Sequence, residues 1–338
     1  MRKASKRKRS DAVQTQSEDQ GDTAPAVPFK IEYLPVKAGK SGKRTSRQTT
    51  SSTPEEPVTS LASLDVPHRV TPQHHWEAMR TYRNFFVDPE ELGVDDFVYV
   101  NNGDIELGTD LVDLTLDRKF WVARVLEIRA QDSNHVYLRV AWAYWPDELP
   151  GGAEGHHGKF ELVPSDHLEI IDARAVSGRA EVAHWSEDDG SDRFEDLYWR
   201  QTFSARANVL SPLRKHCKCK KYFNPDSRLL GCSNSACGIW LHEECLLDDA
   251  LAREYARTAS PTTDAAFSSA SKIKRSGKKP WQGILKGFIA QEANGLWIHI
   301  RDMISVGPDI ARTKESLANA PLIAANRAAC LVCGHKIT

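Results

Sequence analysis

The first 216 residues of this 338-residue chain contain no cysteine, and no apolar run anywhere is long enough to span a bilayer. The N-terminus also lacks the hydrophobic segment of a secretory signal, so we expect an intracellular protein. Neither sign of charge is in excess, because 45 Lys and Arg balance 46 Asp and Glu. The net charge of −1 predicts no general affinity for polyanions, although local basic runs occupy residues 2–9 and 272–279. We expect the first run to contribute to nuclear import.

All seven cysteines lie between residues 217 and 333. An odd number of cysteines in an intracellular protein argues against a disulfide framework and favours metal binding. Together with one histidine they form four pairs. The candidate ligands are Cys217, Cys219, Cys232, Cys237, His242, Cys245, Cys330 and Cys333. Because structural zinc takes four Cys or His ligands, these eight predict two closed zinc sites with no open position for chemistry.

The fourth pair, Cys330 and Cys333, follows the third after 84 residues. Either these two cysteines complete the second site, or they are bystanders on a C-terminal tail. The entropy of closing a loop grows slowly with its length, so the long separation does not forbid a shared site. A site left with two ligands would bind zinc poorly, which favours the complete set.

The composition divides the chain into three parts. Residues 1–80 are rich in polar residues and poor in aromatics, so we expect a disordered tail. Residues 85–212 contain β-branched and aromatic runs separated by Gly, Asn, Asp and Pro, which predict a compact β domain. Residues 213–338 carry the metal ligands, and 246–329 form an insertion before the fourth pair. Within that insertion an Asn-Gly turn separates two strand-like runs in residues 283–303.

Aromatic residues are concentrated in the segment VAWAYWPDEL, residues 140–149. We expect the runs 120–128 and 135–145 to pair as an antiparallel hairpin, with partner numbers that sum to about 263 to 265. This register places Trp121, Trp142 and Tyr144 on one face of the hairpin, and Trp145 on the other. Three such aromatics can be ordinary core. They can equally form a cage for a trimethylammonium group.

The order of the metal ligands, four cysteines, one histidine and three cysteines, resembles that of the PHD finger. In this cross-braced module the first and third pairs share one zinc, and the second and fourth pairs share the other. The resemblance assigns Cys217, Cys219, His242 and Cys245 to one zinc, and Cys232, Cys237, Cys330 and Cys333 to the second. PHD fingers often bind a histone peptide, and the resemblance implies Phe223 and Trp240 as residues of a possible peptide site.

The stretch from FWVARV to VAWAYWPDELPGG and SDHLEIID resembles the bromo-adjacent homology (BAH) domain. A BAH domain followed by such a finger resembles the short plant and fungal chromatin readers of a Polycomb-type histone mark. The expected fold is therefore mainly β, a barrel-like BAH domain followed by a small two-zinc finger. The resemblance assigns a methyl-lysine cage to Trp121, Trp142 and Tyr144. It assigns histone-tail contacts to His167 and Glu169.

The resemblance implies a nonenzymatic nuclear reader that binds trimethylated lysine on the histone H3 tail, H3K27me3, and acts with a repressive chromatin complex. The alternative is a BAH-PHD scaffold that binds nucleosomes or proteins independently of methylation. An enzyme is a third class. It is disfavoured because the zinc ligands are structural and no glycine-rich cofactor loop or nucleophile elbow is present. We expect no membrane association and no sequence-specific reading of DNA.

Overall fold

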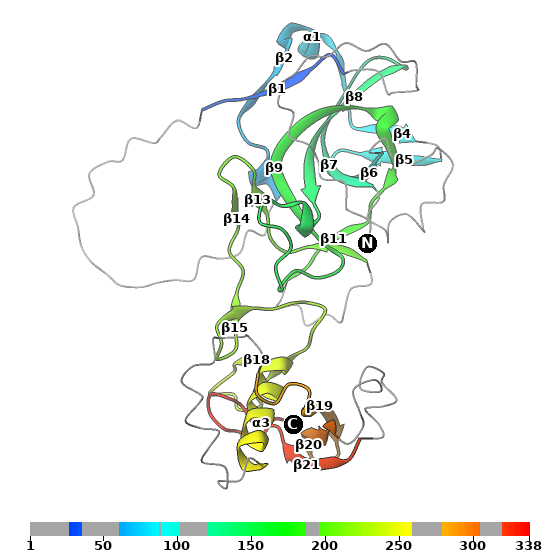
Figure 1. The fold of residues 1–338 in the computed structure, drawn as a ribbon. Helices are drawn as coiled ribbons and strands as arrows, with labels where there is room; N and C mark the ends of the chain where they lie inside the picture. Colours follow the sequence, from blue (N-terminus) through cyan, green and yellow to red (C-terminus); the bar gives the residue numbers. More distant parts are fainter. Residues whose placement is uncertain are drawn as a thin grey trace, which may run out of the picture. The chain divides into compact units, whose positions relative to one another are not determined.

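The computed structural model describes residues 27–35, 61–87, 89–101, 120–186, 196–258, 279–304 and 320–338. The chain divides into two compact units, residues 1–213 and 214–338. Strands dominate both units, which confirms the expected mainly-β class (Figure 1). Among the described residues, no helix combines the length and the apolar character needed to cross a membrane.

A curved antiparallel sheet forms the centre of unit 1 (Figure 1). Its strand order is β10-β6-β7-β8-β9-β12-β11, in which the pairs β9–β12 and β12–β11 are parallel and the others antiparallel. The strands are β6 (Phe97–Val100), β7 (Trp121–Asp132), β8 (His135–Tyr144), β9 (Glu161–Asp172), β10 (Val176–Arg179), β11 (Val182–His184) and β12 (Leu197–Trp199). The three long strands β7, β8 and β9 are rich in β-branched and aromatic residues, which favour a pleated, buried surface.

Shorter elements surround this sheet. The strand β3 (Arg80–Tyr82) pairs with β7, and β13 (Phe203–Ser204) pairs with both β9 and β14 (Val209–Leu210). The strands β4 (Asn84–Val87) and β5 (Glu90–Gly93) form a separate hairpin. Three short 3-10 helices also belong to the described part of the unit, η1 (Leu61–Leu64), η2 (Pro146–Glu148) and η3 (Ala173–Ala175).

The expectation that residues 1–80 are disordered is wrong for two stretches. Residues 27–35 contain β1 (Lys30–Tyr33), which pairs with β2 (His68–Thr71), and α1 (Gln73–Ala78) follows. Buried apolar side chains explain this order, because Phe29 packs edge-on against the rings of Trp76 and Tyr137 at 5.2 and 5.1 Å. These few core residues were missed because the average composition of the whole segment is polar. The remaining parts, including the basic run 2–9, lie outside the described residues.

The β7–β8 hairpin has the predicted register beside the aromatics, whereas two irregularities shift the sums to 266 and 267 nearer the turn. Val122 pairs with Ala143 and Ala123 with Trp142, so both pairs of numbers sum to 265. The two faces belong to different core clusters. Ala123 and Trp142 lie in one cluster, against which Trp121 and Tyr144 also pack, whereas Val122, Ala143 and Trp145 lie in the other. The prediction that Trp121, Trp142 and Tyr144 share a face, with Trp145 opposite, is confirmed.

Unit 2 combines two small hairpins, one helix and a three-stranded sheet (Figure 1). The hairpins are β15 (Lys215–His216) with β16 (Lys221–Tyr222), and β17 (Leu229–Gly231) with β18 (Trp240–His242). The helix α3 (Glu243–Thr258) follows directly. The sheet consists of β19 (Leu285–Glu292), β20 (Gly295–Asp302) and β21 (Leu322–Arg327) in antiparallel order.

The described parts of the insertion fold together with the finger. Leu246 on α3, Leu285 on β19 and Ile298 on β20 share one core cluster with Leu241, which precedes the ligand His242. The predicted Asn-Gly hairpin is present, with Glu292 paired to Gly295. A side chain at Gly295 is excluded on two grounds, because φ is +122° and an added Cβ would lie 2.7 Å from the carbonyl oxygen of Ile337.

Candidate functional site

The three predicted cage aromatics lie close together in unit 1, but they differ in exposure. The rings of Trp121 and Trp142 meet edge to face, with centroids 5.6 Å apart and planes at 83°. Trp142 is only 3% exposed, whereas Trp121 and Tyr144 are half-buried. Trp142 therefore contributes mainly to the core, and Trp121 and Tyr144 present the accessible aromatic surface.

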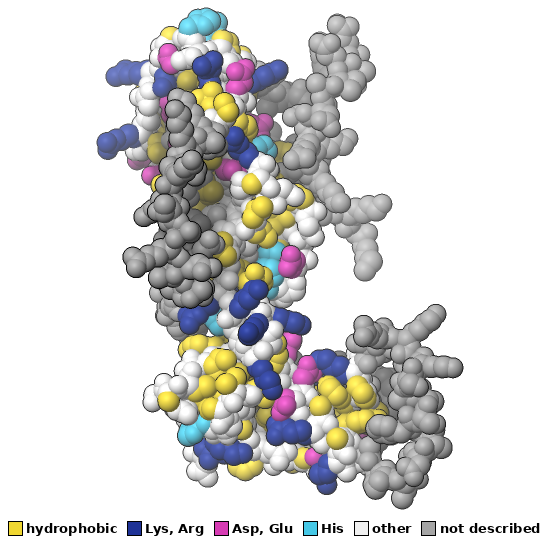
Figure 2. Space-filling model, turned by 90° about the vertical axis from the view of Figure 1, so that its left-hand side faces the viewer, with side chains coloured by type: hydrophobic (Ala, Val, Ile, Leu, Met, Phe, Trp, Pro, Cys, Tyr) yellow, Lys and Arg dark blue, Asp and Glu magenta, His cyan; other side chains and the backbone are white. Residues whose placement is uncertain are grey.

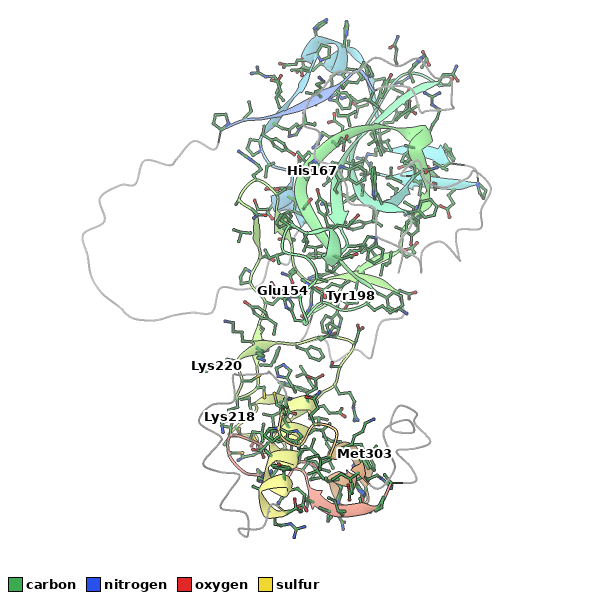
Figure 3. The ribbon with its side chains drawn as sticks, in the orientation of Figure 1. Glu154, His167, Tyr198, Lys218, Lys220 and Met303 are labelled. Atoms are coloured by element: carbon green, nitrogen blue, oxygen red, sulfur yellow. The ribbon has the colours of Figure 1, made fainter. Side chains whose placement is uncertain are left out.

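The two predicted histone-contact residues are bonded directly to the aromatics. The indole N–H of Trp142 donates to Oε2 of Glu169 at 2.7 Å. The hydroxyl of Tyr144 lies 2.6 Å from Nδ1 of His167, and the two rings are nearly parallel with centroids 6.1 Å apart. The structure thus gathers all five predicted residues, and Figure 3 labels His167 on β9. These bonds fix the orientation of the rings, which a cage requires.

A bulge in β9 places His167 beside Tyr144. Ala141 pairs with Leu168 but Ala143 pairs with Pro164, so three residues of β9 lie opposite the single residue Trp142. Bulges re-aim side chains and leave backbone groups unpaired, which must find other partners. Side chains supply these partners, since Ser165 Oγ donates to the carbonyl of Trp142 at 2.7 Å and accepts from the N–H of His167 at 3.2 Å.

The same bulge is held on its outer side by two further residues. The carboxylate of Asp166 accepts from the hydroxyl of Ser204 at 2.8 Å and from the N–H of Ala205 at 2.6 Å. The hydroxyl of Tyr33 on β1 accepts from the N–H of Leu168 at 2.7 Å. Burial raises the pKa of Tyr33, so the hydroxyl keeps its proton.

Sequence reasoning missed Tyr33, because it lies in a tail assigned to disorder. The available signal was the alternating run KIEY, residues 30–33, which is typical of a half-buried strand. Four residues are too few to stand out from the polar composition around them.

The first predicted metal site is assembled from both hairpins of the finger and the start of α3. The ligand atoms of Cys217, Cys219, His242 and Cys245 all lie within 4.8 Å of one another. Nδ1 of His242 is 3.2 Å from Sγ of Cys219 and 3.8 Å from Sγ of Cys245. Burial lowers the pKa of His242, which favours the neutral ring that can bind a metal.

The second predicted site is completed by the C-terminal pair. The sulfurs of Cys232, Cys237, Cys330 and Cys333 also lie within 4.8 Å of one another. Sγ of Cys232 is 3.6 Å from that of Cys333, and Sγ of Cys237 is 3.9 Å from that of Cys330. Four sulfurs at about 2.3 Å from a zinc ion in a tetrahedron are separated by about 3.8 Å. Both clusters therefore have the spacing of tetrahedral zinc sites, and the sulfurs of Cys330 and Cys333 lie in the second cluster.

The thiols of these clusters differ in acidity. The backbone N–H of His335 lowers the pKa of Cys333 to about 7. Burial and the neighbouring Cys217 raise the pKa of Cys245 to about 12. Since the thiolate is the form that binds metal, Cys245 needs the charge of a bound cation to lose its proton at neutral pH.

The two residues of the possible peptide site have different environments. Phe223 is buried and packs edge-on against the ring of His216 at 6.3 Å. Trp240 is 46% exposed, and its ring covers the backbone of Gly231. Phe223 is therefore a core residue of the finger. Of these two residues, only Trp240 offers an aromatic surface to a ligand.

Comparisons with known proteins agree with this architecture. The BAH domain family matches residues 90–202. The chromatin remodeling protein EBS of Arabidopsis thaliana is 33% identical over 133 residues, which are 37% of this chain and 55% of that protein. The chromatin remodeling protein SHL of the same plant is 32% identical over 131 residues, 37% of this chain and 57% of that protein. The chain thus matches little more than half the length of these relatives.

A solved structure, the yeast Rsc2 BAH domain, overlaps 40% of this chain and 55% of its own with a TM-score of 0.30 and 12% identity. With a TM-score this low, the structural overlap adds nothing to the sequence matches. Residues 90–202 match the BAH domain family, and the chain is similar to two chromatin remodeling proteins. The chain therefore contains a BAH domain.

Proposed function

We propose that this protein is a nonenzymatic chromatin reader whose BAH domain binds trimethylated lysine on the histone H3 tail. Its mark is the Polycomb-type H3K27me3, and its role is to support transcriptional repression in the nucleus with a repressive chromatin complex. The names of the two relatives support a chromatin-associated role. In unit 1 the aromatic site binds the methylated lysine. In unit 2 two structural zinc ions stabilise the finger.

One observation carries the proposal. Trp121 and Tyr144 offer half-buried aromatic surface on one face of the hairpin, with Trp142 packed beneath Trp121. A trimethylammonium group has no N–H to donate, so it is attracted by the π faces of aromatic rings rather than by ordinary acceptors. The exposed carboxylate of Glu169 adds a negative charge beside the rings.

The finger supports this role structurally. Zinc bound by the two four-residue clusters would fix the β15–β16 and β17–β18 hairpins to the C-terminal segment. Both clusters are closed sets of four ligands, so zinc there would supply folding energy rather than an open coordination position for catalysis.

A methylation-independent scaffold is the second candidate, and the burial of Trp142 favours it. An indole that is 3% exposed and donates to Glu169 is explained by packing alone. In that case the face would bind nucleosomes or proteins through shape and charge, and the aromatics would serve the core.

An array of modified histone peptides, probed with the full chain, separates the two candidates. The reader requires binding to H3K27me3 peptides above the same peptides without the methyl groups. Signals that are independent of methylation would favour the scaffold. Full-length protein is needed because β1, β2 and β3 belong to unit 1 and a shorter BAH segment would lack them.

A further inference from the structure

A run of positive charge surrounds the first metal cluster. The segment RKHCKCKKYF, residues 214–223, contains five Lys or Arg and no acidic residue. All five are exposed, whereas His216 and Cys217 between them are buried. The described part of unit 2 has acidic residues, but they are concentrated on α3 with its residues Glu243, Glu244, Asp248, Asp249 and Glu254.

The hairpin geometry keeps these charges together. Lys215 pairs with Tyr222 and His216 with Lys221, and the turn between the strands carries Lys218 and Lys220. Figure 3 labels Lys218 and Lys220 on the same outer side of unit 2. The turn is joined to β18 at its start, because the N–H of Cys217 donates to the carbonyl of Trp240 at 2.8 Å, and Cys217 and Cys219 lie in the first ligand cluster.

Three lysines of the hairpin form no side-chain ion pair within the described part of the chain. They are Lys218, Lys220 and Lys221, and all three are exposed. Figure 2 shows that Lys and Arg side chains stand out from the surface on the face it draws. By contrast, Arg253 and Arg257 on α3 are paired with Asp249 and Glu254. A group of unpaired like charges repels itself, and a polyanion would relieve that repulsion.

We propose that the hairpin 214–222 is a DNA-contacting surface that binds the phosphate backbone of duplex DNA without reading its sequence. The choice of DNA rests on the proposed chromatin function, since a histone-tail reader works beside nucleosomal DNA. Duplex DNA carries one negative charge per about 1.7 Å of its axis, so five cations on one small hairpin can meet several phosphates. Backbone contacts of this kind position a protein but carry no sequence information.

The test compares two variants of the full chain. The neutral variant combines Lys218→Gln, Lys220→Gln and Lys221→Gln, and the matched control replaces the same three residues with Arg. Fluorescence anisotropy measures binding to two unrelated duplexes over a range of salt concentrations. We expect the neutral variant to bind both duplexes about ten- to a hundred-fold more weakly. Its plot of log K against log salt should be shallower by about 0.9 for each lost phosphate contact, whereas the Arg variant keeps affinity and slope.

Two further measurements keep the result interpretable. Zinc content must be the same in all variants, and a second control, Lys286→Gln with Lys336→Gln, removes exposed charge elsewhere on unit 2. Unchanged DNA binding in the neutral variant overturns the proposal, as does an equal loss in the second control. Loss of binding to an acidic peptide, with DNA binding intact, assigns the surface to a protein instead. Titration with the methylated H3 peptide is run in parallel, so a failure of the reader function is seen separately.

Discussion

The hydroxyl of Tyr33 accepts a hydrogen bond of 2.7 Å from the backbone N–H of Leu168. This contact joins β1 to β9 across 135 residues of sequence, at the residue that follows His167. Tyr33 thereby supports the bulge that brings His167 to Tyr144. A segment with the composition of a disordered tail thus takes part in the candidate site.

The first prediction concerns this contact. Tyr33→Phe leaves the N–H of Leu168 without its partner, and we expect unit 1 to lose about 1 to 3 kcal/mol of stability. Because His167 is then held less firmly, peptide affinity should also fall. Chemical denaturation and peptide titration check the two effects. Tyr82→Phe is the matched control, since that ring is 42% exposed, and identical behaviour of the two variants would rule out this role of Tyr33.

The second prediction separates the two tryptophans. Trp142→Ala removes a buried side chain and should cost about 3 to 5 kcal/mol, so the domain will be strongly destabilised. Trp121 is half-buried, and Trp121→Ala should leave unit 1 folded with a smaller loss. Thermal melts of both variants test this order. An equally stable pair would mean that Trp142 is not a core residue, contrary to its contacts.

The third prediction concerns metal content. The double substitution Cys330→Ser with Cys333→Ser should reduce bound zinc from two equivalents to about one, because each cluster closes with four ligands. Cys217→Ser with Cys219→Ser should remove the other equivalent. Elemental analysis of the purified proteins provides the count. Two equivalents in the first variant would show that the C-terminal pair is not needed.

The fourth prediction concerns acid. Burial, with the neighbouring His156 and Arg200, lowers the pKa of His157 to about 4. Its Nδ1 accepts from the N–H of Glu154 at 2.9 Å, which requires the unprotonated nitrogen. The unfolded chain takes up this proton near pH 6.5, so stability from this group is complete above that pH. It is lost as the pH falls toward 4, by at most about 1.4 kcal/mol per pH unit.

His157→Gln provides the comparison for this prediction. Glutamine keeps an acceptor for the Glu154 N–H but cannot titrate. Urea unfolding at pH 7.5, 6.0 and 5.0 should show a steeper loss of stability in the unchanged protein than in the variant. Parallel curves would remove His157 as a source of acid sensitivity.

The sequence predicted the features that depend on local pattern or strict spacing. Strand alternation and an expected turn at 131–134 sufficed for the register of β7 and β8 beside Trp142, and therefore for the shared face of Trp121 and Tyr144. The two irregularities nearer the turn were not predicted. The count of Cys and His residues predicted eight ligands for two sites, and the resemblance to the PHD finger divided them into the two clusters that the structure shows.

Features that depend on contacts between distant parts of the sequence could not be predicted from local pattern or spacing. The bulge of β9 adds residues opposite Trp142, and its bonding to Tyr33 links segments that only the folded chain brings together. The burial of Trp142 and Phe223 likewise follows from packing rather than from residue type. Strands β19 and β20 were visible as a hairpin, but their common core with Leu241 was not.

The proposal that the aromatic face of Trp121 and Tyr144, with Trp142 packed against Trp121, recognises a methylated lysine is tested most directly by calorimetric titration of the full chain. The two ligands are an H3K27me3 peptide and the same peptide without methyl groups, and Trp121→Ala is titrated in parallel. We expect the unchanged chain to prefer the trimethylated peptide. The loss of one aromatic wall should weaken that binding by about two- to thirty-fold, since cation–π contacts contribute about 0.5 to 2 kcal/mol each. Equal affinity of the unchanged chain for the two peptides would contradict the proposal.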